Sequence, residues 1–201
     1  MGVAVTTWVV VLVKDFGSAK QRLMPALDAP SRRALARSNA EKAIVASAAG
    51  DDRVVVAGSE EVAALARGMG VEAIVEPRQD GQNVAAARGI AFAVGHGAEA
   101  VLLLSSDLPL VTQNAVAEVL AAGARMAAPA AVAVAAIGRG GTNALYLRPP
   151  DSVTLHFGSE SLEKFRHEAE ERGVNFTIHH SDAMALDLDE PADLARLRRA
   201  V

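Results

Sequence analysis

The chain has 201 residues, 51% of them hydrophobic and 3% aromatic, and a formal net charge of −4. This length suffices for one sizeable core, and the charge argues against nucleic acid as the main partner. The absence of cysteine excludes disulfides, thiolate catalysis and cysteine-held zinc. No apolar run approaches the roughly 20 residues that span a bilayer, and no secretory signal opens the chain, so we expect a cytoplasmic protein.

Apolar runs and helical patterns alternate up to residue 122. Each run stops at turn residues, as strands buried on both faces of a parallel sheet do. We expect strands at residues 6–13, 53–57 and 72–75, and another in the run that begins at Val101. Helices are expected between and after them, over residues 31–49, 60–67, 84–94 and 113–122.

The pattern changes after residue 122. The second half of Ala121–Ala136 alternates valine and alanine as a strand does, and a glycine-rich loop from Gly138 leads into a further strand. We expect an amphipathic helix at 162–172, a strand at 174–180 and a last helix with Pro191 in its first turn. The whole order predicts an α/β fold with a mostly parallel sheet and right-handed crossovers.

Asp107 follows the aliphatic run Val101–Leu104, so we place it just past the carboxyl end of the central strand. Ligands of open α/β sheets bind at that edge. A carboxylate there suits a metal ion that carries phosphates, and an aspartate in a turn that caps the next helix is an equal alternative. Asp187 and Asp189 place two more carboxylates on one side of an extended segment. With Asp107 they form a candidate Mg²⁺ site, unless Asp189 serves only to cap the last helix.

Cations and anion-cradling segments occur at other loops of the same chain. Lys14, Lys20 and Arg22 follow the first strand, where cations can clamp a polyphosphate, although a solvated basic loop is the alternative. Gly140–Asn143 and Phe157–Ser161 both suit an anion through exposed N–H groups, although a hairpin turn and an ordinary helix cap would look the same. Together these segments indicate phosphate chemistry at one sheet edge without naming the reaction.

Six motifs run in order along nearly the whole chain. They are Lys14-x5-Lys20-x-Arg22-Leu23, Asp80-Gly-Gln-Asn83, Ser106-Asp-Leu-Pro109, Gly141-Thr-Asn-Ala-Leu145, Phe157-Gly-Ser-Glu-Ser161, and Asp187-Leu-Asp189 with Pro191 and Asp193-Leu194. Together they resemble the small guanylyltransferases of deazaflavin coenzyme F(420) biosynthesis, which use 2-phospholactate or phosphoenolpyruvate and are related to molybdenum-cofactor and sugar nucleotidyltransferases. Two positions depart from that family: Leu12-Val13 stands where a proline often precedes the first lysine, and Gln82 stands where a leucine is common.

The resemblance implies a single nucleotidyltransferase domain over residues 1–201, with a three-layer, glycosyltransferase-A-like α/β fold. Residues of about 1–110 would form the nucleotide-binding half and about 111–201 the acceptor-binding half. The implied site residues are catalytic cations Lys14, Lys20 and Arg22, nucleotide-binding Gly81, Asn83 and Ser106, acceptor-binding Thr142, Gly158 and Ser161, and Mg²⁺ ligands Asp107, Asp187 and Asp189.

The implied reaction transfers GMP from GTP to the phosphate of a small phosphorylated carboxylic acid and releases pyrophosphate. That phosphate is already anionic, so catalysis needs alignment and charge neutralisation rather than a general base. We expect neither nucleic acid nor a membrane as a partner, and a monomer and a homodimer both stay open. The alternatives are a molybdenum-cofactor or sugar-phosphate nucleotidyltransferase, whose Leu-x-Gly-Gly loop this chain lacks, and a nucleotide-binding protein without catalysis.

Overall fold

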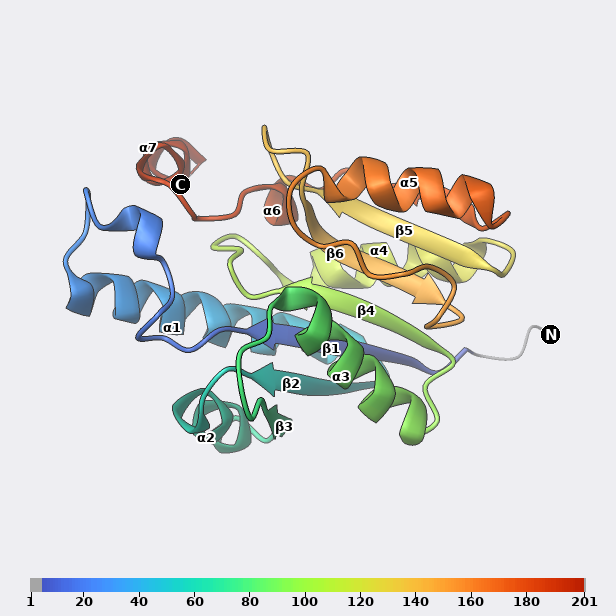
Figure 1. The fold of residues 1–201 in the computed structure, drawn as a ribbon, viewed down its shortest axis with the longest axis horizontal. Coiled ribbons are helices and arrows are strands. Elements are labelled where there is room, and N and C mark those ends of the chain that lie inside the picture. Colours follow the sequence, from blue (N-terminus) through green and yellow to red (C-terminus); the bar gives the residue numbers. More distant parts are fainter. Residues whose placement is uncertain (1–4, 201) are drawn as a thin grey trace.

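A seven-stranded sheet forms the centre of the computed structural model, which describes residues 5–200 (Figure 1). The strands are β1 (Thr7–Val13), β2 (Asp52–Ala57), β3 (Glu72–Val75), β4 (Ala100–Ser105), β5 (Ala130–Ala135), β6 (Thr142–Arg148) and β7 (Asn175–Ile178). The helices are α1 (Ala29–Ala46), α2 (Glu60–Gly68), α3 (Gln82–Gly95), α4 (Gln113–Arg125), α5 (Ser161–Glu171), α6 (Asp182–Ala185) and α7 (Pro191–Ala200). Two 3₁₀ turns, η1 (Gln21–Leu23) and η2 (Ser47–Ala49), flank α1.

The strand order is β3-β2-β1-β4-β6-β5-β7, and all strands except β6 run in the same direction. The expectation of an α/β fold with a mostly parallel sheet is therefore confirmed. The long crossovers through α1, α2 and α3 produce the parallel pairs, because parallel neighbours need a connection that returns along the sheet. Strand β6 follows β5 through a short glycine-containing loop and pairs antiparallel to both β4 and β5.

Side chains that alternate along β1 explain why helices cover both faces of the sheet, which gives the fold three layers. Val9, Val11 and Val13 belong to one buried cluster, which also contains residues of α1, α2 and α4. Trp8 and the valine and leucine that alternate with it belong to a second cluster, which contains residues of α3 and α5. Successive side chains of a strand point to opposite faces, so each face of the sheet receives its own helices. Figure 1 shows α3 and α5 on the face turned to the viewer.

Small residues let the helices approach the sheet closely. A Cβ added to Gly89 of α3 would lie 2.2 Å from Cγ1 of Val10, and one added to Gly123 of α4 would lie 2.3 Å from Cε1 of Tyr146. Both distances are shorter than any real Cβ contact, so these glycines are required by packing. Thr112 caps α4, since its Oγ1 accepts a hydrogen bond from the Ala115 N–H at 3.1 Å.

One edge of the sheet collects the loops that carry the motifs. The carboxyl ends of β1, β2, β3 and β4 meet there, at the left of Figure 1. Because β6 runs the opposite way, its first residue, Thr142, also lies at this edge, opposite Ala135 at the end of β5. Residues from both halves of the chain are thereby brought together. Within residues 5–200, none of the helices combines the length and apolarity needed to cross a membrane.

Candidate active site

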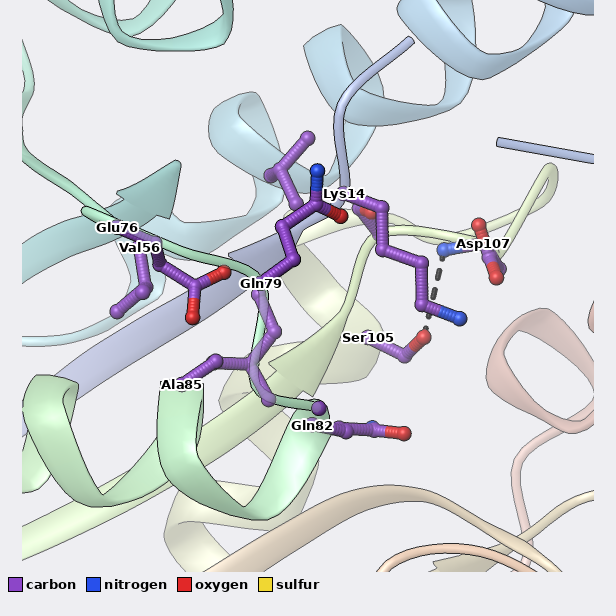
Figure 2. A pocket seen from close by; sticks show the side chains of 12 residues that line it. Lys14, Val56, Glu76, Gln79, Gln82, Ala85, Ser105 and Asp107 are labelled. Atoms are coloured by element: carbon purple, nitrogen blue, oxygen red, sulfur yellow. Dashed lines mark hydrogen bonds between the residues drawn. The ribbon is translucent and has the colours of Figure 1, made fainter. Parts of the chain in front are cut away.

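Two connected cavities open at the carboxyl edge of the sheet. The smaller measures about 180 Å³ and the larger about 610 Å³. Lys14, Gln82, Ser105 and Asp107 line both, so they mark the place where the cavities join. Figure 2 shows these side chains on one side of the smaller cavity, and Glu76, Val56 and Ala85 on the other. The arrangement offers a smaller, more apolar compartment for a flat group and a larger, polar compartment for charged groups.

The smaller cavity contains two of the three residues expected to bind a nucleotide. Gly81 and Ser106 both line it. Gly81 precedes α3 with a φ of 98°, a conformation that glycine adopts at little cost, and no atom lies within 4 Å of its missing Cβ. The backbone at this turn is therefore open to a ligand.

Asn83, the third of these residues, uses its side chain elsewhere. Its Nδ2 donates to the Phe157 carbonyl at 3.2 Å, and its Oδ1 accepts from the Phe157 N–H at 2.8 Å. Both polar atoms of the amide are thus engaged by one backbone residue. Asn83 connects the start of α3 to the loop before α5, and its direct contact with a nucleotide stays a prediction.

The three predicted cations occupy different environments. Lys14 is exposed at the end of β1, and in Figure 2 its ammonium group points toward Ser105 and Asp107. Lys20 is buried, with its side chain 2% exposed, and its Nζ lies 2.6 Å from both Asp107 Oδ1 and the Leu188 carbonyl oxygen. Arg22 is largely exposed and pairs with Asp189 Oδ2 at 2.8 Å. All three line the larger cavity.

The three predicted metal ligands also line the larger cavity, where they are paired with cations. Asp187 Oδ2 lies 2.9 Å from Nη1 of Arg139, and Asp189 Oδ2 lies 3.9 Å from the same atom. Within residues 5–200, no three side chains of the histidine, cysteine, aspartate and glutamate types lie close enough together to hold a metal ion as they stand. Carboxylate oxygens are nevertheless the donors that Mg²⁺ prefers.

The electrostatics favour an additional cation beside Asp187. Burial raises the pKa of its carboxyl group; Arg139 opposes this shift, while the charges of Asp193 and Asp107 add to it. Asp187 is therefore close enough to Asp193 and Asp107 to be affected by their charges. A divalent ion at Asp187 would relieve both this repulsion and the cost of burying the carboxylate.

The buried side chain of Asp193 holds the backbone of Asp189, one of the predicted metal ligands. Its Oδ2 accepts hydrogen bonds from the Asp189 N–H at 3.0 Å and the Glu190 N–H at 2.8 Å, and it also pairs with Arg139. Although burial raises the pKa of Asp193, the hydrogen bonds from the Glu190 and Asp189 amides and the Arg139 guanidinium lower it below its usual value. Asp193 therefore caps α7 and holds Asp189 in place, in the reciprocal half of a capping box.

The predicted acceptor residues also line the larger cavity. Thr142 and Ser161 are buried, and their hydroxyl oxygens lie 3.1 Å apart. Gly158 has a φ of 128° and open space at its missing Cβ. Asn143, next to Thr142, donates to the Met184 carbonyl at 2.8 Å and the Ala185 carbonyl at 3.1 Å. It thereby ties β6 to the segment that carries Asp187.

Sequence reasoning did not select Glu76 and Arg139 as site residues. Glu76 follows β3 and lines the smaller cavity, and Arg139 lines the larger one. Each could have been suspected from its position beside a strand end or a glycine-rich loop, but neither belongs to a spaced motif. Their partners, Arg88 for Glu76 and three aspartates for Arg139, are set by the fold.

Comparison with known proteins decides the family. The model of the family described as "Guanylyl transferase CofC like" matches residues 7–198. The chain belongs to this family. It is 36% identical to a phosphoenolpyruvate guanylyltransferase of Conexibacter woesei over 98% of this chain and 89% of the relative. It is 31% identical to a 2-phospho-L-lactate guanylyltransferase of Methanothermobacter thermautotrophicus, over 95% of this chain and 83% of the relative.

A solved structure supports the fold independently of these sequences. A nucleotidyl transferase from Methanothermobacter thermautotrophicus superposes with a TM-score of 0.67 at 17% identity, covering 97% of each chain. At this identity the likeness concerns the fold alone. The nucleotidyltransferase fold expected from the motifs is thereby confirmed.

Proposed function

We propose that this protein transfers GMP from GTP to the phosphate of a small phospho-acid, phosphoenolpyruvate or 2-phospholactate, and releases pyrophosphate. The two adjacent cavities carry this proposal, because the smaller, more apolar one suits a base and the larger, polar one suits a triphosphate beside an anionic acceptor. The relatives named for guanylyl transfer to these two acids support it. The resemblance would place the reaction in coenzyme F(420) biosynthesis.

The residues divide into three groups in this proposal. Gly81 and Ser106 contact the nucleotide in the smaller cavity. Lys14, Lys20 and Arg22 balance the triphosphate charge, while the Thr142 and Ser161 hydroxyls and the Gly158 backbone bind the acceptor. The two ligands then meet beside Lys14 and Asp107, where the cavities join.

Asp107, Asp187 and Asp189 would hold Mg²⁺ in the larger cavity. The ion would neutralise charge on phosphate oxygens when bound. Lys20 and Arg139 now pair with the same carboxylates, so they keep this acidic group compensated in the protein without the ion.

The chemistry requires little from protein side chains besides position and charge. An oxygen of the acceptor phosphate attacks the α-phosphorus of GTP, a new P–O bond forms, and the bond to pyrophosphate breaks. The attacking oxygen is anionic at neutral pH, so no proton has to be removed from it. The cavity therefore acts by aligning two anions that otherwise repel each other.

The experiment measures pyrophosphate release from GTP and Mg²⁺ with phosphoenolpyruvate, 2-phospholactate and 3-phosphoglycerate in turn. ATP and CTP serve as control nucleotides, and omission of Mg²⁺ tests the metal. Release with GTP and one acid supports the proposal and identifies the acceptor. Release with none of the three, by protein that still binds GTP, overturns it.

The Asp107→Asn variant tests the role of the central carboxylate. An asparagine at this position keeps the shape of the side chain and can still accept a hydrogen bond from Lys20, so we expect the fold to persist. Turnover should fall at least about 100-fold, because the variant loses a charge at the reacting groups. Near-normal turnover would exclude Asp107 as a metal ligand.

A further inference from the structure

At the end of the smaller cavity away from Lys14, Glu76 lies beside the apolar side chains of Val56 and Ala85 (Figure 2). In Figure 2, the Glu76 carboxylate extends into this end, on the opposite side from Lys14 and Asp107. A nucleotide whose phosphates lie near Lys14 and Asp107 would therefore place its base beside Glu76.

The position of Glu76 is fixed by the sheet. Glu76 directly follows β3, and its N–H donates to the Ala57 carbonyl at 2.9 Å, which continues the pairing between β2 and β3. Its side chain is only 7% exposed. Burial raises the pKa of this carboxyl group, and the neighbouring Arg88 opposes the shift. Burying a carboxylate beside apolar side chains costs free energy, which indicates that Glu76 has a role other than contact with solvent.

Arg88 holds the orientation of the carboxylate while leaving part of it free. Its Nη1 lies 2.8 Å from Glu76 Oε1, and its other contacts are with Asp80 Oδ2 at 3.5 Å and the Arg78 carbonyl at 3.4 Å. Among the described residues, no hydrogen bond reaches Glu76 Oε2. A carboxylate has about four acceptor positions, so Glu76 keeps acceptor capacity for a ligand.

We propose that Glu76 recognises guanine by accepting hydrogen bonds from its N1–H and its 2-amino group. These two donors lie side by side on the Watson–Crick edge of guanine, and a carboxylate can accept both, as it does from the fork of an arginine. The inference deepens the proposed function, since it names the residue that would select GTP.

The same group would reject the other common bases. Adenine presents an acceptor at N1 and cytosine an acceptor at N3, and either would face a buried carboxylate without a donor between them. An unpaired buried acceptor is more costly than a lost hydrogen bond. Glu76 would therefore select GTP both by attraction and by exclusion.

The test compares Glu76→Gln with the original protein by calorimetric binding of GTP, ITP and XTP. ITP lacks the 2-amino group, and XTP has a carbonyl oxygen in its place. The original protein should bind GTP about 10- to 100-fold more tightly than ITP, because one charge-assisted hydrogen bond is lost. The glutamine of the variant offers an N–H to the 2-oxygen of XTP, so the GTP-to-XTP preference should change by about 100-fold toward XTP.

Glu72→Gln is the matched control. It removes the same charge at the first residue of β3, an exposed position outside the cavity, and it should keep the original order of affinities. Equal weakening of all three nucleotides by Glu76→Gln would assign Glu76 to the ribose or to folding and overturn the inference. So would an unchanged preference for GTP.

Turnover is measured on the same samples, which separates the two proposals. If the original protein binds GTP but releases no pyrophosphate, the proposed function fails while the binding ratios still decide the role of Glu76. If it releases pyrophosphate and the ratios do not change in Glu76→Gln, the inference fails alone. If it binds none of the three nucleotides, both fail.

Discussion

Asn83 and Phe157, which are 74 positions apart, exchange two hydrogen bonds that join the start of α3 to the loop before α5. One element borders the smaller cavity, and the other carries Gly158 into the larger one. The side chain of Asn83 thus sets the distance between the two proposed ligand sites. Reaction between two bound ligands is sensitive to such spacing.

Asn83→Ala removes both hydrogen bonds and leaves two backbone groups of Phe157 without them. We expect a loss of stability of about 1–3 kcal/mol and a raised KM for the acceptor, with a smaller effect on GTP binding. Chemical denaturation and initial-rate kinetics measure the two effects. Asn114→Ala is the control, because Asn114 is also the second residue of a helix, and within residues 5–200 its side chain bonds to exposed Glu118 alone. Equal changes in both variants would contradict a linking role for Asn83.

Lys14 is exposed and Lys20 is buried, so substitutions of these two lysines should have different effects. Lys20→Met leaves the Leu188 carbonyl and Asp107 without their charged partner, so stability should fall by about 2–3 kcal/mol. Lys14→Met should change stability by less than about 0.5 kcal/mol and reduce kcat/KM at least about tenfold. Thermal unfolding and pyrophosphate release check the pair. A stable Lys20→Met protein with reduced activity would show that Lys20 acts only on the substrate.

Much of the fold could be predicted because turn residues in the sequence mark where its strands and helices end. The strand expected at 72–75 matches β3, and the first strand differs from β1 by one residue. The antiparallel pairing of β6 with β5 agrees with the hairpin turn that Gly140–Asn143 allowed, whereas its pairing with β4 could not be predicted, because nothing in an apolar strand specifies its second neighbour. Helix α6 was not predicted, since its four residues are too few to show helical periodicity.

The site was predictable where residues follow strands within spaced motifs. Asp107, Thr142 and Gly158 lie together as expected because strand ends and their loops meet at one edge. Pairings across the chain were not visible in the sequence. Arg139 and Asp187 are 48 positions apart, and only the antiparallel turn into β6 brings them within 2.9 Å.

Glu168 bonds to the loop before Gly158, and its ionisation makes the stability of the fold depend on pH. Its carboxylate accepts from the Thr154 N–H at 3.0 Å and contacts His156 Nε2 at 2.5 Å and Arg172 at 2.7 Å. Although burial raises the pKa of Glu168, the Thr154 and His156 hydrogen bonds and Arg172 lower it below its usual value of 4.5. A lowered pKa means that the ionised group stabilises the fold above about pH 4.5, and that this contribution is lost as the pH falls through the lower, folded-state value.

Glu168→Gln should therefore be less stable than the original protein at about pH 7, and the difference should shrink as the pH falls through the lowered pKa of Glu168. Urea unfolding at several pH values measures it. Glu171→Gln, on the same helix with its side chain 64% exposed, should show little difference at any of them. A Glu168→Gln deficit of the same size throughout would attribute the loss to packing instead of ionisation.

Arg139 competes with the proposed Mg²⁺ for the same carboxylates, since it pairs with Asp187 and lies near Asp189. Arg139→Met should therefore bind Mn²⁺, used as a spectroscopic substitute for Mg²⁺, several-fold more tightly, because two carboxylates lose a competing cation. The same change should reduce stability, since buried Asp193 loses a partner. Arg196→Met is the control: Arg196 also approaches Asp193, at 3.4 Å, and is not among the residues that line the larger cavity. Paramagnetic resonance titration of Mn²⁺ measures the affinity without requiring turnover. Weaker or unchanged Mn²⁺ binding by Arg139→Met would contradict direct competition and move the ion away from Asp187.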